Sequence, residues 1–232
     1  MFSNLMQWVI MLDTETCAIL RANGVIPHNN LIYNIGLCLF CPATGETIHT
    51  RSYIINEIFF GERERMNSCY YAKKIPQYLD GIANHKYTCV GFFDVMNEIN
   101  RLCKEYNVVA ICAHNARFDI DALNTTCQYL MGMNYVRPLP QDIEVWDSVK
   151  MARSVIASRP TYQKFCRENN YLTKHKTPRP RLTAEILYRF ISQNNEFIEA
   201  HTALEDVKIE LEIVKKCYKT HKKMKKVLYA AR

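Results

Sequence analysis

Two carboxylates stand two residues apart where an apolar segment of the sequence ends. Residues 8–12 are all apolar, and Asp13 and Glu15 follow them directly. Side chains at positions i and i+2 of a β-strand point to the same face, so both carboxylates are expected to project together. Such a pair repels itself unless a proton or a cation lies between the two groups, and carboxylate oxygens suit Mg²⁺ or Mn²⁺. Taken alone, the pair also fits the start of a solvated loop.

A second pair of acids lies in the segment AHNARFDIDAL, at residues 113–123. A short apolar strand ends there and a helix over 117–131 is predicted to begin. Asp119 and Asp121 are two residues apart, which on a helix turns them about 200° away from each other. At most one of them can face a shared site, and an acid near a helix start is also a common capping residue.

A histidine and an acid stand at the start of the last predicted helix. Thr202 and Glu205 have the spacing of a capping box, which predicts Thr202 as the N-cap and a helix beginning at Ala203. His201 and Asp206 then occupy the two positions that a hydrophobic staple normally brings into contact. Because neither residue is apolar, the pair calls for a chemical explanation.

The elements that position these groups predict an α/β fold. Residues 7–13 are typical of a strand buried on both faces. Two further apolar segments, 31–40 and 47–55, are separated by a Pro/Gly turn and predict a hairpin, so the first three strands form a meander. Strands and helices then alternate, and helices close the chain. The main predicted helical segments are 92–106, 117–131, 161–171, 181–195 and 203–219. A short helix is also expected near residues 75–83, and residues 144–156 predict a brief strand that leads into a helix.

The charge of the chain is concentrated at its end. The net charge is +7, but residues 215–232 hold seven lysines and one arginine with no acid, which leaves 22 basic and 23 acidic side chains in residues 1–214. We interpret 215–232 as a basic C-terminal helical extension that either steers polyanions or only adds solubility. The segment 174–181 is predicted to be an exposed basic loop.

Other classes of protein are disfavoured by the composition. The sequence contains no membrane span and no secretory signal, which predicts a cytoplasmic protein. Its ten cysteines are scattered singly through apolar segments, as expected of reduced, buried thiols. Cys38 and Cys41 form one C-x-x-C, but no partner follows at a zinc spacing, so core packing is favoured over metal binding.

The order of the three motifs resembles that of the DEDDh 3′–5′ exonucleases, a branch of the ribonuclease H-like superfamily. The resemblance spans residues 9–214 and rests on D-x-E after the first strand, HNARFD in mid-chain and H-x-x-x-x-D near the last helix. It implies a ribonuclease H-like fold in which helices flank a central mixed five-stranded sheet, a β-meander followed by parallel strands. Residues 1–214 would form the exonuclease domain.

By this resemblance, four acids hold two divalent ions, Mg²⁺ or Mn²⁺, and a histidine acts as general base. The positions that match are Asp13, Glu15, Asp119 and Asp206 for the ions and His201 for the base. The expected reaction is a two-metal hydrolysis that releases 5′-mononucleotides from the 3′ end of a single strand. A DNA polymerase or other replication protein is a candidate partner.

By the same resemblance, five further residues are expected to have weaker roles in nucleic-acid binding. Thr14 and Thr16 flank the acids and are expected to meet the terminal nucleotide, and Asn115 is expected to contact substrate or fix a local conformation. Arg117 is a candidate phosphate contact, although an exposed arginine is equally consistent with the sequence. Phe118 is a candidate wedge, but core packing is the favoured interpretation.

The sequence departs from the family after the first motif. Many members continue with threonine and glycine, whereas here Cys17 follows and the next glycine is Gly24. This change leaves the sugar preference open. DNA is the favoured substrate, and an exoribonuclease that trims RNA 3′ ends, or an oligoribonuclease, is the alternative. A small-nucleotide phosphodiesterase and a catalytically inactive nucleic-acid-binding partner are less favoured.

Overall fold

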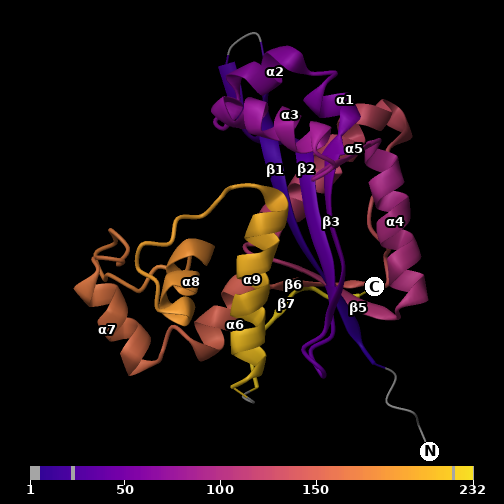
Figure 1. The fold of residues 1–232 in the computed structure, drawn as a ribbon. Helices are drawn as coiled ribbons and strands as arrows, with labels where there is room; N and C mark the ends of the chain where they lie inside the picture. Colours follow the sequence, from indigo (N-terminus) through magenta and orange to yellow (C-terminus); the bar gives the residue numbers. More distant parts are fainter. Residues whose placement is uncertain (1–5, 22–23, 221–222, 232) are drawn as a thin grey trace, which may run out of the picture.

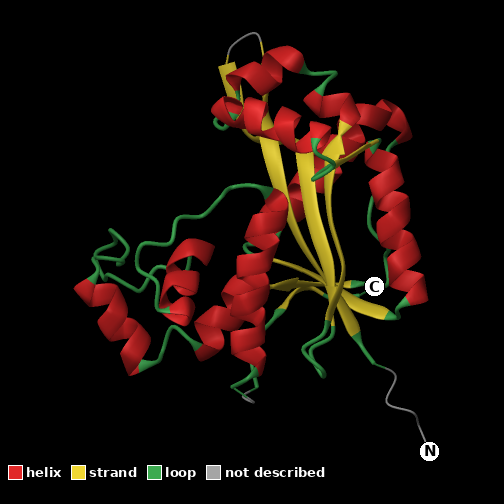
Figure 2. Ribbon diagram, viewed as in Figure 1, coloured by secondary structure: helices red, strands yellow, loops and turns green. Residues whose placement is uncertain are grey.

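The computed structural model describes residues 6–21, 24–220 and 223–231, which form a mixed sheet covered on both faces by helices (Figures 1 and 2). The strands are β1 (Trp8–Arg21), β2 (Gly24–Phe40), β3 (Thr47–Ile55), β4 (Thr88–Val90), β5 (Val108–Ala113), β6 (Glu144–Asp147) and β7 (Val227–Tyr229). The α-helices are α1 (Asn56–Phe59), α2 (Arg63–Ser68), α3 (Ile75–Ala83), α4 (Phe92–Glu105), α5 (Arg117–Met131), α6 (Ser148–Val155), α7 (Pro160–Glu168), α8 (Ala184–Ser192) and α9 (Ala203–Tyr218). Two 3₁₀ turns are η1 (Ala72–Lys74) and η2 (Gly132–Asn134).

The first strand is buried on both faces, as predicted, because its side chains alternate between two hydrophobic clusters. Ile10 and Leu12 pack in the cluster that includes residues of α4 and α5. Val9 and Met11 pack in the other, with residues of α6 to α9. All four side chains are at most 1% exposed. Figure 1 shows α9 and α4 on opposite sides of the sheet.

The sheet confirms the predicted mixed topology. Its order is β4-β3-β2-β1-β5-β6-β7 within the described residues; β1, β2 and β3 form the antiparallel meander, and β1, β5 and β6 are parallel. The two edge strands, β4 and β7, bring the number of strands to seven instead of the predicted five. Each is three residues long and contains no fully buried side chain, so neither carries the apolar pattern that identifies a strand.

The predicted helical extension over 215–232 is wrong for most of its length. Helix α9 ends at Tyr218, and the later segment Val227–Tyr229 pairs antiparallel with β6. Just before this strand, the ammonium of Lys226 lies 3.4 Å from the centroid of the Trp146 ring on β6. A strand edge and a cation–π contact thus override the helical tendency of a lysine-rich segment.

The main predicted helices are present. Helices α4, α5, α7, α8 and α9 lie within or close to the predicted segments. In the part of the chain that the structure describes, none of them has the length and apolar character needed to cross a bilayer. Cys38 and Cys41 are both buried, in different clusters, which agrees with their assignment to core packing.

The start of α9 is capped from another strand. The helix begins at Ala203, as predicted, but the Thr202 side chain makes no capping hydrogen bond, so the predicted capping box is wrong. Instead the backbone N–H of Ala203 donates to Asn34 Oδ1 on β2 at 3.1 Å. Asn34 is fully buried and also donates to Ser52 Oγ and to the Tyr53 carbonyl. A tertiary contact satisfies the first helical amide in place of the local side chain.

The same contact requires a glycine on β2. A Cβ atom on Gly36 would lie 2.4 Å from the carbonyl carbon of Ala203 and from the amide nitrogen of Leu204. These neighbours are backbone atoms, which cannot rotate away from an added Cβ as a flexible side chain can. Gly36 therefore sets how closely the sheet and the start of α9 approach each other.

Replacing Gly36 with alanine is expected to push the start of α9 away from the sheet. We expect Gly36→Ala to lower the free energy of unfolding by about 1–3 kcal/mol, the usual cost of overpacking. Urea denaturation followed by circular dichroism measures this loss. Gly91→Ala is the comparison, because its added methyl would meet carboxylate ends rather than backbone. Equal losses in the two variants would contradict the proposed close approach.

Candidate active site

The first two acids lie inside β1 and not at its end. The strand was expected to stop at residue 13, but pairing with β2 continues it to Arg21. Its pairing with β5 stops earlier, at Met11 opposite Cys112. Asp13 and Glu15 follow on the face of β1 that Val9 and Met11 present to α9. The carboxylates therefore emerge where β5 has ended.

Asp119 is fixed to β1 by two hydrogen bonds. It stands in the first turn of α5, and its Oδ1 accepts from the backbone N–H of Thr14 at 3.1 Å and from the Thr14 hydroxyl at 2.8 Å. Only 2% of Asp119 is exposed, whereas Asp121 is exposed and borders a separate hollow. At most one acid of this pair was expected to face a shared site: Asp119 is buried against Thr14, which lines the cavity described below, and Asp121 points elsewhere.

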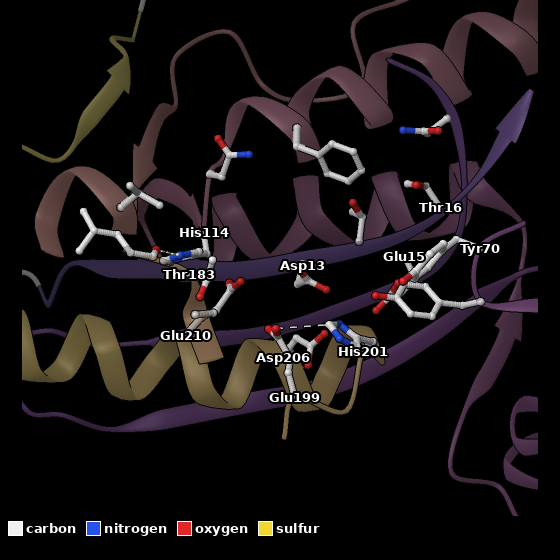
Figure 3. A pocket seen from close by; sticks show the side chains of 18 of the residues that line it. Asp13, Glu15, Thr16, Tyr70, His114, Thr183, Glu199, His201, Asp206 and Glu210 are labelled. Carbon is white, nitrogen blue, oxygen red and sulfur yellow. Dashed lines mark hydrogen bonds and ion pairs between the residues drawn. The ribbon is translucent and has the colours of Figure 1, made fainter. Parts of the chain in front are cut away.

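His201 and Asp206 join the cluster from the start of α9. Glu15, His201 and Asp206 each place one ligand atom within 4.8 Å of the others, a spacing that could hold a metal ion. Figure 3 shows these side chains converging on one cavity with Asp13. His201 has a left-handed backbone with φ of 50°, which turns the chain sharply before the helix begins.

Two residues of the connection between α2 and α3 hold the His201 loop. The Lys74 ammonium donates to the carbonyl of Ala200 and, at 3.0 Å, to the carbonyl of His201. The Tyr71 ring stacks on the imidazole, with centroids 5.0 Å apart and planes 25° apart. Burial and the nearby Lys74 charge lower the pKa of His201. These contacts position a neutral imidazole that can accept a proton.

A cavity of about 830 Å³ contains most of the predicted site residues. Those that line it are Asp13, Thr14, Glu15, Thr16, Asn115, Phe118, His201 and Asp206. Arg117 is exposed and does not belong to the described lining. Phe118 is 38% exposed and forms part of the wall, so the favoured interpretation of core packing is wrong. At the first turn of α5 its ring points to the cavity because Asp119 and Ile120 take the buried positions.

Several lining residues were not identified from the sequence. Glu199 lines the cavity, and its Oε2 lies 3.9 Å from His201 Nδ1. Glu210 lines it from α9, four residues after Asp206 and hence on the same helical face, a spacing that could have identified it. The contacts of Tyr71 and Lys74 with the His201 loop join segments more than 120 residues apart, and no local pattern predicts them.

The turn after β5 forms the opposite wall. His114 Nδ1 lies 2.7 Å from Ser148 Oγ, and Nε2 lies 2.7 Å from the Leu182 carbonyl. Since a carbonyl can only accept, Nε2 carries the proton and Nδ1 accepts from the hydroxyl. Burial lowers the pKa of His114. The next residue, Asn115, has φ of 63°, and its backbone N–H donates to Asp147, which caps α6.

The acids of the cavity hold their protons far more strongly than acids in water. Burial, followed by repulsion from Glu210, raises the pKa of Asp13 well above its ordinary value. Burial raises the pKa of Glu15 to about 7, although the Lys74 charge opposes the change. Burial also raises the pKa of Asp119 to about 7, against the hydrogen bond from Thr14, and that of Asp206 to about 8.

The donor set fits divalent cations. Asp206 Oδ1 and Glu210 Oε2 are buried and accept no hydrogen bond from any residue that the structure describes. An unpaired buried carboxylate is costly unless a proton or a cation compensates it. Oxygen ligands from carboxylates are those that Mg²⁺ and Mn²⁺ prefer. The site therefore has the chemistry of a cation site.

Comparison with solved structures identifies the fold. No family model matches the sequence, and no significant match to a curated protein was found. The chain is similar to a 3′-exonuclease solved for its 3′-end-specific recognition of the histone mRNA stem-loop, with TM-score 0.57, 11% identity and coverage of 96% of this chain and 86% of the other.

Two more solved structures show the same architecture. One is the nuclease domain of 3′hExo, a DEDDh family member bound to rAMP, with TM-score 0.55, 10% identity and coverage of 96% and 97%. The other is E. coli Exonuclease I with a dA16 oligonucleotide, with TM-score 0.51, 16% identity and coverage of 90% of this chain but 41% of the other. The predicted resemblance is confirmed at the level of architecture: the chain has a DEDDh exonuclease-like fold.

The raised pKa values predict how stability depends on pH without metal. These acids have pKa values near 7 or 8 in the folded chain and near 4 in the unfolded chain. Between those pH values the folded state binds more protons than the unfolded state, so the free energy of unfolding falls as the pH rises. Each group contributes up to about 1.4 kcal/mol per pH unit. In chelator, the thermal midpoint should fall from pH 5 to pH 8, and Mn²⁺ should raise it more at pH 8.

The variant Asp13→Asn controls for titration elsewhere in the chain. Removing one buried acid should reduce both the fall of the midpoint with pH and the stabilisation by Mn²⁺. Differential scanning fluorimetry measures both effects. A wild-type midpoint in chelator that rises steadily from pH 5 to pH 8 would contradict the inferred pKa shifts.

Proposed function

We propose that this chain is a divalent-cation-dependent 3′–5′ exonuclease that releases 5′-mononucleotides from single-stranded nucleic acid, with DNA favoured. The observation that carries the proposal is the convergence of Asp13, Glu15, His201 and Asp206 on one cavity, with Asp119 bonded to its wall through Thr14. The fold supports it, since the solved structures that this chain resembles include 3′-exonucleases.

Four acids would hold two cations, Mg²⁺ or Mn²⁺. These are Asp13 and Glu15 from β1, Asp119 from α5 and Asp206 from α9. When bound, the ions supply Lewis acidity that activates water and stabilises the leaving 3′ oxygen. Thr14 keeps Asp119 turned toward β1, and Lys74 offsets part of the negative charge on Glu15 and Asp206.

His201 would act as the general base. Its lowered pKa leaves the imidazole neutral near pH 7, so it can accept the proton of the attacking water. Nδ1 faces Glu199 at 3.9 Å, and we assign Nε2 as the accepting nitrogen. Once the ring is protonated, Glu199 stabilises its positive charge, and the Tyr71 ring limits its rotation.

The cavity would bind the terminal nucleotide. Its volume of about 830 Å³ lies in the range of small-molecule sites. Phe118 offers an aromatic face on which a base can stack, and Thr16 and Asn115 offer polar groups. Arg117, exposed outside the described lining, would contact a phosphate further along the strand. With DNA as substrate, a polymerase or other replication protein is the partner we propose.

An exoribonuclease is the second candidate. The solved structures include the nuclease domain bound to rAMP and the exonuclease that recognises a histone mRNA stem-loop. The 2′-hydroxyl is the group by which a protein distinguishes the two substrates at a given site. Matched oligomers of DNA and RNA therefore separate the candidates.

The central assay uses matched single-stranded DNA and RNA oligomers, each labelled at the 5′ end. We expect stepwise shortening from the 3′ end with Mg²⁺ or Mn²⁺, faster on DNA, and no cleavage in excess chelator. Asp119→Asn should reduce the rate by more than about 100-fold, whereas Asp121→Asn, an exposed acid on the same helix, should leave it unchanged. Cleavage in excess chelator would refute the proposal, and faster RNA shortening would favour the second candidate.

His201→Asn tests the general base separately from the cation site. We expect kcat to fall about 10²- to 10⁴-fold, the usual contribution of a positioned base, with Mn²⁺ affinity nearly unchanged. Asparagine tolerates the left-handed backbone at this position. His85→Asn is the matched control, since His85 is exposed and has φ of 56°. A loss of Mn²⁺ affinity as large as the loss of kcat would make His201 a metal ligand instead.

A further inference from the structure

Glu210 places an additional acid in the proposed cation site. It lies on α9 one turn after Asp206, is 3% exposed and lines the same cavity. Figure 3 shows both side chains rising from α9 toward the cavity that Asp13 also enters. The three motifs that resemble the exonuclease family do not include this position.

One oxygen of Glu210 has no partner among the residues that the structure describes. Oε2 is buried and accepts no hydrogen bond, and the same holds for Asp206 Oδ1. A leucine or methionine would fill this helical position without burying a polar group. A buried carboxylate without a compensating group destabilises the folded state. The carboxylate of Glu210 therefore requires either a proton or a cation.

The charges around Glu210 are unevenly distributed across the cavity. Lys74 acts on Glu15 and Asp206 and lowers the pKa of both. The strongest charges acting on Asp13 are four acids, with Glu210 the largest, and no described cation is among them. Around Glu210 the principal charges are also acids, and the backbone N–H of His114 is the contact that opposes them. Lys74 thus acts on the Glu15 side of the cavity, whereas the charges that act most strongly on Asp13 are all negative.

We propose that Glu210 is a fifth carboxylate of the divalent-cation site and binds a cation together with Asp13. This inference rests on the proposed cation site, because it assigns one more ligand to it. Five carboxylates would then face two divalent ions, and Lys74 would balance part of the remaining negative charge. The chemical class of the ligand is a hard divalent cation, Mg²⁺ or Mn²⁺.

Mn²⁺ binding to the full-length chain tests this assignment without any nuclease assay. Isothermal titration calorimetry on wild type and Glu210→Gln should show an affinity at least 10-fold weaker in the variant, by analogy with the 10- to 100-fold effects of groups that support metal ligands. In chelator at pH 8 the variant should melt at the same temperature as wild type or higher, since it lacks a buried acid. Its stabilisation by Mn²⁺ should be smaller.

Two further variants make the outcome unambiguous. Glu212→Gln is the matched control: it lies on the same helix, is half exposed, pairs with Lys215 and should bind Mn²⁺ as wild type does. Glu210→Met removes both the charge and the polar group and should weaken Mn²⁺ binding like Glu210→Gln, even if the amide changes local packing.

Each result bears on the assignment. Wild-type Mn²⁺ affinity in both Glu210 variants would overturn it and leave the four-acid site intact, with Glu210 a protonated neighbour of Asp13. Absence of Mn²⁺ binding in wild type would overturn the proposed cation site as well. Weaker binding in both Glu210 variants, with Glu212→Gln unchanged, supports the assignment.

Discussion

The mutual repulsion of carboxylates buried in one cavity is the constraint on which the rest of the structure depends. Six acids from four parts of the chain border or support it. They are Asp13, Glu15, Asp119, Glu199, Asp206 and Glu210. Burial makes every one of them a stronger base than in water. The repulsion between these buried acids is unfavourable, so the packing of the surrounding strands and helices must hold the arrangement together.

Two packed elements, β1 and α9, hold the acids in fixed positions. β1 is buried on both faces and pairs with β2 along most of its length, so Asp13 and Glu15 stand on a strand that cannot shift register easily. α9 is docked on β2 by the amide of Ala203, which Asn34 caps, and by the bare backbone at Gly36. Both contacts act at the first residues of α9, directly after His201 and within one turn of Asp206.

The connection between α2 and α3 places a positive charge beside the buried acids. Lys74 binds the carbonyls of the His201 loop and lowers the pKa of nearby acids, while Tyr71 stacks on the imidazole. This segment thus serves structure and electrostatics together. Lys74 acts on Glu15, Glu199 and Asp206, whereas the charges that act most strongly on Asp13 are those of other acids.

The sequence by itself determined the elements that local pattern can encode. The continuous apolar run of β1, the hairpin of β2 and β3 and the bounds of α5 all follow from residue periodicity. Helical geometry showed that at most one of Asp119 and Asp121 could face a site, and the resemblance to the exonuclease motifs chose Asp119. The order of the motifs was sufficient to predict the fold. The strands and helices could be predicted because residue periodicity depends only on neighbours within about one helical turn or one strand pair.

Only the tertiary structure decided the contacts between distant segments. The N-terminus of α9 is capped by Asn34, 169 residues away, and so the local capping box does not form. β7 forms because the edge of β6 offers hydrogen bonds and Trp146 offers an aromatic face to Lys226. The place of Glu210 in the cavity likewise depends on how α9 lies across β1. Each of these interactions pairs groups far apart in the chain, and burial by the whole fold decides whether a polar group needs a partner.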